Sequence, residues 1–255
     1  DANRPGAVMV WVHGGAYVIG AASQPLYHGR ELVRGGGPES PVVVTLNYRL
    51  GAFGFLELTA LSSGRRPFDT NIGLRDVLFA LQWVRDNIAA FGGDPDRVTL
   101  FGESAGGGIV TTLLASPAAE GLFHRAIAQS SPATSVYSTE RAVRVAEQFL
   151  EHLGLRRSDV DTLPQLPVEA LLAASKHVFD DVPVKAPGTL AFVPIVDGDI
   201  VPDYPVKRAR EGRTHPVPLI IGTNRHEAAL FRWMRSPLMP ITPRTVQGKK
   251  ESQSG

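Results

Sequence analysis

A single serine between two glycines, where an apolar run meets a helical stretch, constrains this chain more than any other feature. Residues 97–101 form a short apolar, β-branched run, and residues 106–114, just after Ser104, read as the opening of a buried helix. Gly102 and Gly106 let neighbouring backbone pass close to a strained serine, and a helix N-terminus beneath the serine favours negative charge. The pattern predicts a tight strand-to-helix turn that exposes Ser104 as a nucleophile. The alternative is a glycine-rich turn whose serine has no chemical role.

A second motif lies upstream, where the apolar residues 8–12 lead into His13-Gly14-Gly15-Ala16. Small residues after a strand allow the main chain itself to approach a substrate oxygen. A strand that ends in His-Gly-Gly, upstream of a serine between two glycines, is typical of a loop whose N–H groups form an oxyanion hole. The order of the two motifs therefore supports the interpretation of the serine as a nucleophile.

Short apolar segments alternate with helical patterns along the chain. The segments with the character of buried strands are residues 8–12, 42–47, 98–101, 125–129 and 217–221. Residues 75–91 place apolar side chains at a 3.6-residue period, and residues 139–153 predict a second amphipathic helix. Residues 163–184 are expected to be helical as well. This alternation predicts an α/β fold with a parallel sheet that helices cover on both faces.

Several further segments occur in the same order as in one known family. They are residues 46–51 (LNYRLG), 71–76 (NIGLRD), 83–95 (WVRDNIAAFGGDP), 123–130 (FHRAIAQS), 192–198 (FVPIVDG) and 222–227 (GTNRHE). With the two motifs above, they make the chain resemble the type-B carboxylesterase/cholinesterase family of α/β hydrolases, from about residue 5 to about residue 243. The resemblance implies an α/β-hydrolase fold.

By that resemblance, residues 1–246 are expected to form a partial α/β-hydrolase domain, incomplete at both ends, with a cap-like insertion at about residues 155–190. The polar residues 247–255 lack periodicity and are expected to form a disordered tail. We therefore interpret the sequence as an internal segment of a longer protein. Such a segment does not distinguish a cytoplasmic from a secreted protein, nor does it indicate an oligomeric state.

The resemblance also implies roles for individual residues. Ser104 is the nucleophile, and Glu227 is the acid that orients the base, because it lies in a loop that matches the family pattern Gly-x-Asn-x-Asp-Glu. The oxyanion-hole donors are the N–H groups of Gly15, Ala16 and Ala105. The family usually has a third glycine where this chain has Ala16, but alanine leaves the N–H available. The alternative for Glu227 is a solvated loop carboxylate.

The base is expected to be missing from this segment. In the family it is a histidine on a later loop, beyond residue 255, and none of the seven histidines of this chain has that context. His226 adjoins Glu227, but adjacent side chains in an extended segment point to opposite faces, which makes it the weaker alternative. His13 is expected to brace the oxyanion loop. The histidines expected at the surface or in loops are His28, His152, His177 and His215.

The resemblance places further residues in or near the substrate site. Gly188 and Leu190 correspond to acyl-pocket positions at which cholinesterases carry bulky aromatic side chains, which predicts a roomier pocket. Glu103, next to the nucleophile, is expected to tune the electric field of the site; the alternative is a buried carboxylate that holds water. Ser130 corresponds to a position that hydrogen-bonds near the triad acid, and a plain strand-end serine is the alternative.

Composition excludes several other classes of function. A net charge of +1 without a basic run argues against a nucleic-acid partner. No apolar stretch reaches the roughly 18 residues of a membrane span. The absence of cysteine excludes disulfides and thiolate metal sites in this sequence. The predicted reaction uses no metal or cofactor, and the expected partner is a small-molecule ester.

These features predict a serine carboxylesterase, in which an ester acylates Ser104 and water then hydrolyses the acyl-enzyme. One alternative is a truncated, catalytically inert esterase remnant. Another is a non-catalytic, adhesion-type relative, which would usually have lost the serine. A hormone-sensitive-lipase-type hydrolase would share the His-Gly-Gly and serine motifs but not residues 87–95 or a glutamate acid.

Overall fold

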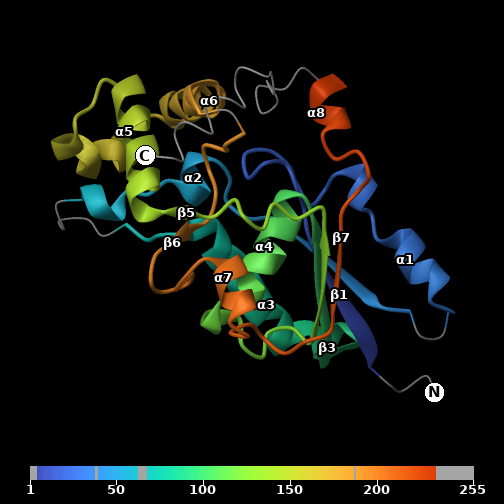
Figure 1. Ribbon diagram of the computed structural model, residues 1–255. Helices are drawn as coiled ribbons and strands as arrows, with labels where there is room; N and C mark the ends of the chain where they lie inside the picture. The colour runs from blue at the N-terminus through green and yellow to red at the C-terminus, as the bar shows by residue number, and fades with distance from the viewer. Residues whose placement is uncertain (1–4, 38–39, 63–67, 187, 234–255) are drawn as a thin grey trace.

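The computed structural model describes residues 5–37, 40–62, 68–186 and 188–233. Its centre is a parallel sheet with the strand order β2–β1–β3–β4–β7, which Figure 1 shows nearly edge-on. The strands are β1 (Gly6–Val12), β2 (Val42–Leu46), β3 (Gly93–Glu103), β4 (Arg125–Gln129) and β7 (Leu219–Gly222). All five predicted strands are confirmed, although β3 begins earlier and β7 later than the sequence indicated.

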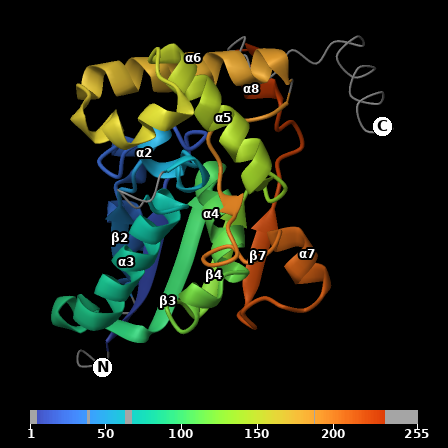
Figure 2. The same ribbon diagram turned by 90° about the vertical axis from the view of Figure 1, so that its left-hand side faces the viewer.

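Helices α3 (Ile72–Asn87), α4 (Ala105–Leu114) and α7 (Pro205–Arg210) lie on one side of the sheet, and α1 (Arg30–Gly35) lies on the other (Figure 1). The remaining α-helices gather near the end of the sheet at which the strands finish (Figure 2). They are α2 (Ala52–Phe55), α5 (Thr139–His152), α6 (Val168–Lys185) and α8 (Ala229–Trp233).

Short 3₁₀ segments and a second sheet complete the described elements. The 3₁₀ segments are Pro25–Tyr27, Thr59–Leu61, Ile88–Phe91, Pro117–Ala119 and Arg157–Gln165. The second sheet pairs β5 (Tyr137–Ser138) with β6 (Ile195–Val196), and its two-residue strands were too short to predict from sequence periodicity. None of the helices in the described ranges combines the length and the apolar character needed to cross a bilayer.

The predicted helices are largely confirmed. The helix predicted over residues 75–91 ends as an α-helix at Asn87 and continues as a 3₁₀ turn, which Gly92 terminates at a φ of 79°. The second amphipathic helix and the helical character of residues 163–184 are also found, as α5 and α6. The expected tail at residues 247–255 lies outside the described residues, and the cap-like role of residues 155–190 stays a prediction.

The core lies between the sheet and the helices on its α3–α4 side. Val8, Val10 and Val12 of β1 are fully buried, because alternate residues of a strand share one face of the sheet. The apolar stripe of α3 packs against the sheet through Leu74, Val77, Leu81 and Val84. Helix α4 is buried around almost its whole circumference, which explains why its residues are glycine and aliphatic side chains apart from two threonines, whose hydroxyls donate to the carbonyl of Gly108.

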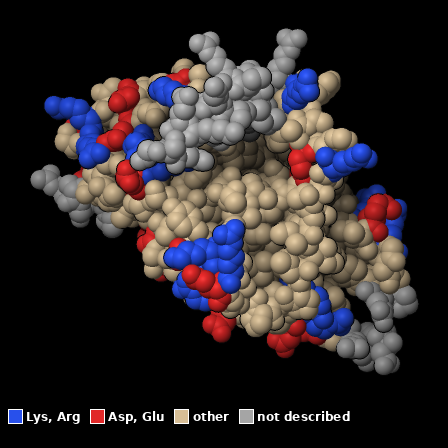
Figure 3. All heavy atoms as spheres, in the orientation of Figure 1, with Lys and Arg blue, Asp and Glu red and all other residues tan. Residues whose placement is uncertain are grey.

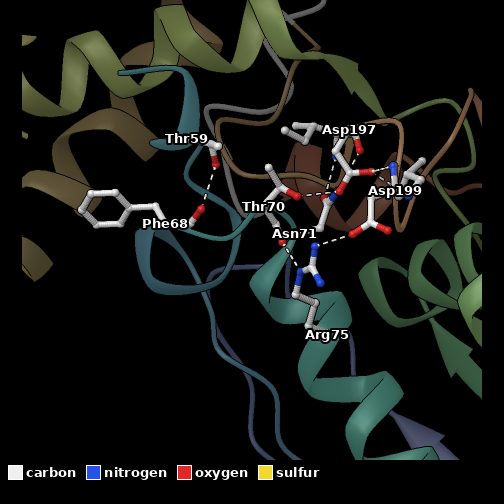
Figure 4. A network of polar contacts seen from close by, with 9 residues as sticks. Thr59, Phe68, Thr70, Asn71, Arg75, Asp197 and Asp199 are labelled. Atoms are coloured by element: carbon white, nitrogen blue, oxygen red, sulfur yellow. Dashed lines mark hydrogen bonds and ion pairs between the residues drawn. The ribbon is translucent and has the colours of Figure 1, made fainter. Parts of the chain in front are cut away.

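A polar network fixes the small sheet to the start of α3 (Figure 4). The side chain of Asn71 accepts the N–H of Ile195 and donates to its carbonyl, both at 2.9 Å. The carboxylate of Asp197 accepts hydrogen bonds from Thr70 at 2.6 Å and from Asn71 at 2.7 Å. The two Ile195 groups that Asn71 contacts are backbone groups in a buried segment, so the amide satisfies a donor and an acceptor that water does not reach.

Strand β7 is the most exposed strand of the sheet. Leu219, Ile220 and Ile221 are 45%, 67% and 58% exposed, and within the described residues β7 pairs only with β4. Figure 3 shows an uncharged surface over this part of the molecule, with Lys, Arg, Asp and Glu side chains mostly around it. An apolar strand with an open edge is a template for pairing with other chains.

We expect Ile220→Lys to slow aggregation of the purified chain by at least about threefold, because a lysine on an edge strand opposes pairing with another chain. Static light scattering at a fixed concentration measures the rate. Phe79→Lys is the control, since Phe79 is 72% exposed on α3, away from the edge. An equal effect of both variants would assign the aggregation to general surface hydrophobicity instead of to β7.

Candidate active site

The serine motif forms the predicted turn between β3 and α4. Ser104 has φ 55° and ψ −121°, a strained conformation for a residue with a side chain. Its N–H donates to the carbonyl of Gln129 at 2.9 Å, and its own carbonyl accepts the N–H of Gly108 at 2.8 Å. A Cβ atom at Gly102 would lie 2.6 Å from the carbonyl carbon of Gly106, so the turn has no room for a side chain there.

The His-Gly-Gly loop lies directly against this turn. A Cβ atom at Gly14 would stand 2.7 Å from the carbonyl oxygen of Glu103 and 3.1 Å from Cβ of Ser104. Gly15 and Ala16 have φ angles of 119° and 53°, which turn the backbone sharply after β1. Within the described chain, no acceptor pairs with the N–H groups of Gly15, Ala16 or Ala105. These backbone donors therefore remain available for a ligand oxygen.

His13 supports the loop from the buried side. Its Nδ1 lies 2.8 Å from the carbonyl oxygen of Gly14, and its ring stacks on Tyr48 at 4.6 Å between centroids. The Tyr48 hydroxyl donates to the carbonyl oxygen of His13 at 2.8 Å. Burial lowers the pKa of His13, against the opposing effect of its contact with Gly14. These contacts agree with the bracing role expected for His13.

Glu227 lies in the turn that follows β7 and is held by two neighbours. Its carboxylate accepts the N–H of Asn224 at 2.6 Å, and the side-chain amide of Asn224 donates to Oγ of Ser130 at 3.1 Å. A hydrogen bond from Ser130, followed by that from the Asn224 N–H, lowers the pKa of Glu227. The carboxylate is exposed, and these donors favour its charged form.

One cavity of about 790 Å³ brings most of the predicted residues together. The residues predicted in or near the site that line it are Ala16, Glu103, Ser104, Ala105, Ser130, Gly188, Leu190 and Glu227. Gly15 is not in the lining, although its loop reaches the cavity through Ala16. His226 is the one histidine in the lining, and all seven histidines of the sequence are described. The cavity therefore joins the ends of β1, β3 and β7 with the segment that precedes β6.

Two carboxyl groups of the cavity are shifted in opposite directions. Burial raises the pKa of Glu103, and the negative charge of Glu227 adds to the increase. The pKa of Glu227 is lowered by its hydrogen bonds. Glu103 is thus the more easily protonated of the two. Among the described residues, no group of three or more His, Cys, Asp or Glu side chains is placed to hold a metal ion.

Sequence reasoning missed some of the residues around the cavity. Tyr17 is almost fully buried at a φ of 64° and lines the cavity, although its sequence signal was only its place after Gly-Gly-Ala. Leu230 and Phe231 of α8 form a further part of the wall. His215 lies in a loop, as expected, but it is half-buried there: its Nε2 lies 2.7 Å from the carbonyl oxygen of Ser116, and its ring meets Phe123 edge-on.

The sequence matches one family model and is similar to two known proteins. The sequence matches the family model described as the carboxylesterase family over residues 1–253. It is 46% identical over 232 residues to the para-nitrobenzyl esterase of Bacillus subtilis (strain 168), covering 88% of this chain and 44% of that protein. It is 39% identical over 243 residues to the "Crystal protein" of Dictyostelium discoideum, covering 94% of this chain and 42% of that protein.

Solved esterase structures are similar to this chain in both sequence and fold. A structure named PNB esterase is 43% identical with a TM-score of 0.80, covering 94% of this chain and 48% of that chain. A carboxylesterase of Geobacillus stearothermophilus is 36% identical with a TM-score of 0.83, covering 100% of this chain and 51% of that chain. The α/β-hydrolase fold is thereby confirmed. The chain spans less than half the length of the two protein relatives above and about half of the solved chains.

We expect Ser130→Ala to raise the pKa of Glu227 toward its usual value, because the variant removes a hydrogen bond to the charged form. A carboxyl-detected NMR titration measures this pKa. Ser131→Ala is the control, because Ser131 lines the same cavity but bonds to Thr111 at 2.9 Å.

The same contact has a consequence for stability. A carboxyl group with a depressed folded-state pKa stabilises the fold above its unfolded-state pKa, and this contribution is lost as the pH falls through the folded value. Ser130→Ala should therefore reduce stability at neutral pH more than at pH values below the folded-state pKa of Glu227. An unchanged Glu227 titration in Ser130→Ala would contradict the assigned contact.

Proposed function

The chain belongs to the carboxylesterase family, and we propose that it contributes the nucleophile, the triad acid and the oxyanion hole of a serine esterase that hydrolyses small carboxylic esters. The observation that carries the proposal is the common cavity lined by Ser104, Glu227 and Ala16, with Ser104 on a strained turn at the start of α4. The proposed oxyanion donors are the N–H groups of Gly15, Ala16 and Ala105.

In the proposed reaction, Oγ of Ser104 attacks the ester carbonyl while a base takes its proton. The three N–H groups stabilise the oxyanion of the tetrahedral intermediate, and the alcohol leaves with the proton returned by the base. Water, activated by the same base, then hydrolyses the acyl-enzyme. Glu227 remains ionised and orients the imidazole, a role supported by the hydrogen bonds that lower its pKa.

The base is proposed to come from polypeptide outside residues 1–255. His226 is the alternative within this chain because it lines the cavity. Residues 225–228 form a turn, so the expectation that His226 and Glu227 point to opposite faces of an extended segment does not apply. The contacts of Glu227 within the described residues are with Asn224 and Ser130 and not with His226, which disfavours this role. An inert esterase remnant remains the competing function, and it would follow if no base reached Ser104.

We expect a fluorophosphonate probe to label Ser104 in the protein that contains this chain, because such probes react with activated serine nucleophiles. Peptide mapping by mass spectrometry identifies the labelled residue. Ser104→Ala should lose the label, and Ser131→Ala, on the same cavity wall, should keep it. A label on another residue would reject the nucleophile, and no label at all would favour the inert remnant.

His226→Ala separates the two candidate bases. If the base lies outside this chain, the variant should keep the turnover of p-nitrophenyl butyrate within about threefold. Loss of a triad base lowers turnover by about 10⁶-fold in a serine hydrolase. A decrease of that size, with the folded state retained by circular dichroism, would assign the base to His226.

Acyl-chain preference tests the proposed pocket residues. Gly188 has a φ of 76°, where any side chain is strained, so Leu190 is the better position for substitution. We expect Leu190→Phe to reduce kcat/KM for hexanoyl relative to acetyl p-nitrophenyl esters by about tenfold or more, since a filled pocket discriminates by roughly 1–3 kcal/mol per methylene. Leu230→Phe, on the α8 wall, is the control. Equal shifts in both variants would remove Leu190 from a specific acyl pocket.

A further inference from the structure

The cavity wall that holds Leu190 belongs to a short segment between the cavity and the small sheet. Gly188, Thr189 and Leu190 line the cavity, and five residues after Leu190 the chain enters β6. Thr189 and residues 191–195 are buried, whereas Leu190 is half-buried. The position of Leu190 therefore depends on how the segment is held at its two ends.

The β6 end is fixed by the network of Figure 4. Asn71 bonds to both backbone groups of Ile195, and Asp197 accepts from Thr70 and from the N–H of Val201 at 2.8 Å. The side chains of this network come from the start of α3 and from the residues that follow β6. None of these bonds reaches Leu190, so the cavity end of the segment needs a separate anchor.

Tyr137 supplies that anchor. Its hydroxyl oxygen accepts the N–H of Leu190 at 3.1 Å, and its own N–H donates to the carbonyl of Pro194 at 3.1 Å. In β5 it pairs with Ile195, and the guanidinium of Arg141, on the first turns of α5, lies 3.8 Å from its ring centroid. One residue thus holds both ends of the segment, with its ring direction supported by a cation–π contact.

We propose that Tyr137 is a positioning residue that sets the acyl-chain preference of the esterase by holding Leu190 against the cavity. The inference rests on the proposed function. Tyr137 is not among the residues that line the cavity, so it acts through the backbone of Leu190. Without the hydroxyl, a partly buried N–H loses its acceptor, and the wall relaxes to satisfy that group.

Tyr137→Phe tests the anchor, because it removes one oxygen and keeps the ring. We expect the amide hydrogen of Leu190 to exchange about tenfold faster by NMR, the effect of one lost hydrogen bond. Thr139→Val is the matched control: it removes the bond from Thr139 to the carbonyl of Val196 at 2.9 Å, in the same small sheet, without touching Leu190. Unchanged exchange at Leu190 in Tyr137→Phe would overturn the proposal.

A second measurement separates positioning from general stability. In Tyr137→Phe, the ratio of kcat/KM for hexanoyl and acetyl p-nitrophenyl esters should move toward unity by about fivefold, while kcat for the acetyl ester stays within about twofold. Thr139→Val should leave the ratio unchanged. Faster exchange with an unchanged ratio would make Tyr137 a structural residue only and reject the proposal.

Failure of the proposed function gives a different result from failure of the role of Tyr137. If the unmodified protein hydrolyses no ester, the esterase proposal fails, and the preference is measured as the binding ratio of hexanoate to butyrate from amide chemical shifts. Tyr137→Phe should then move that ratio toward unity as well. If Tyr137→Phe has the same hexanoate-to-butyrate binding ratio as the unmodified protein, the role of Tyr137 is overturned. It is also overturned if the unmodified protein binds neither carboxylate.

Discussion

The close approach of two backbone segments at Gly106 is the constraint on which the rest of the site depends. A Cβ atom there would lie 2.1 Å from the carbonyl oxygen of Val12, so any other residue would push α4 away from β1. Because β1 and β3 are neighbouring parallel strands, this contact sets the end of β1 against the turn that carries Ser104. The loop that begins at His13 then passes directly beside the serine, with a Cβ position at Gly14 only 3.1 Å from Cβ of Ser104.

Other predicted site residues also lie at the ends of the parallel strands. Parallel strands finish at one edge of the sheet, and in α/β folds this edge is where ligands bind. Glu103 ends β3, Ser130 follows β4, and Glu227 follows β7 by a few residues. The pKa of Glu103 is raised and that of Glu227 is lowered, so Glu227 loses its proton at a lower pH than Glu103. Opposite pKa shifts of two neighbouring carboxyl groups are a common feature of catalytic sites.

Local sequence patterns predicted the central fold and the turn because short-range physics determines them. Buried strands need continuous apolar runs, and the positive φ of Ser104 requires small neighbours, so both leave a signature in adjacent residues. The small sheet of β5 and β6 has no such signature, since its pairing depends on Asn71, far away in the chain.

Contacts between distant segments explain the other misses. His215 is a loop residue, but its contacts with Ser116 and Phe123 could not be predicted because only the fold brings these segments together. Tyr137 gave no functional signal because its effect on the cavity passes through one hydrogen bond to Leu190. The family resemblance supplied Glu227 and the pocket positions, which periodicity alone could not identify.

The strand order determines when the candidate site assembles during folding. In the sheet, Val8 lies opposite Val98 and Ala126 opposite Leu219, so each pairing closes a loop of about ninety residues. Such long-range contacts form late, because the chain loses conformational entropy before the contacts stabilise it. Ser104 meets the loop that begins at His13 only after the first closure, and Glu227 only after the second. An incompletely folded chain therefore lacks the close approach of Ser104 to this loop and to Glu227, and the candidate site assembles only together with the finished sheet.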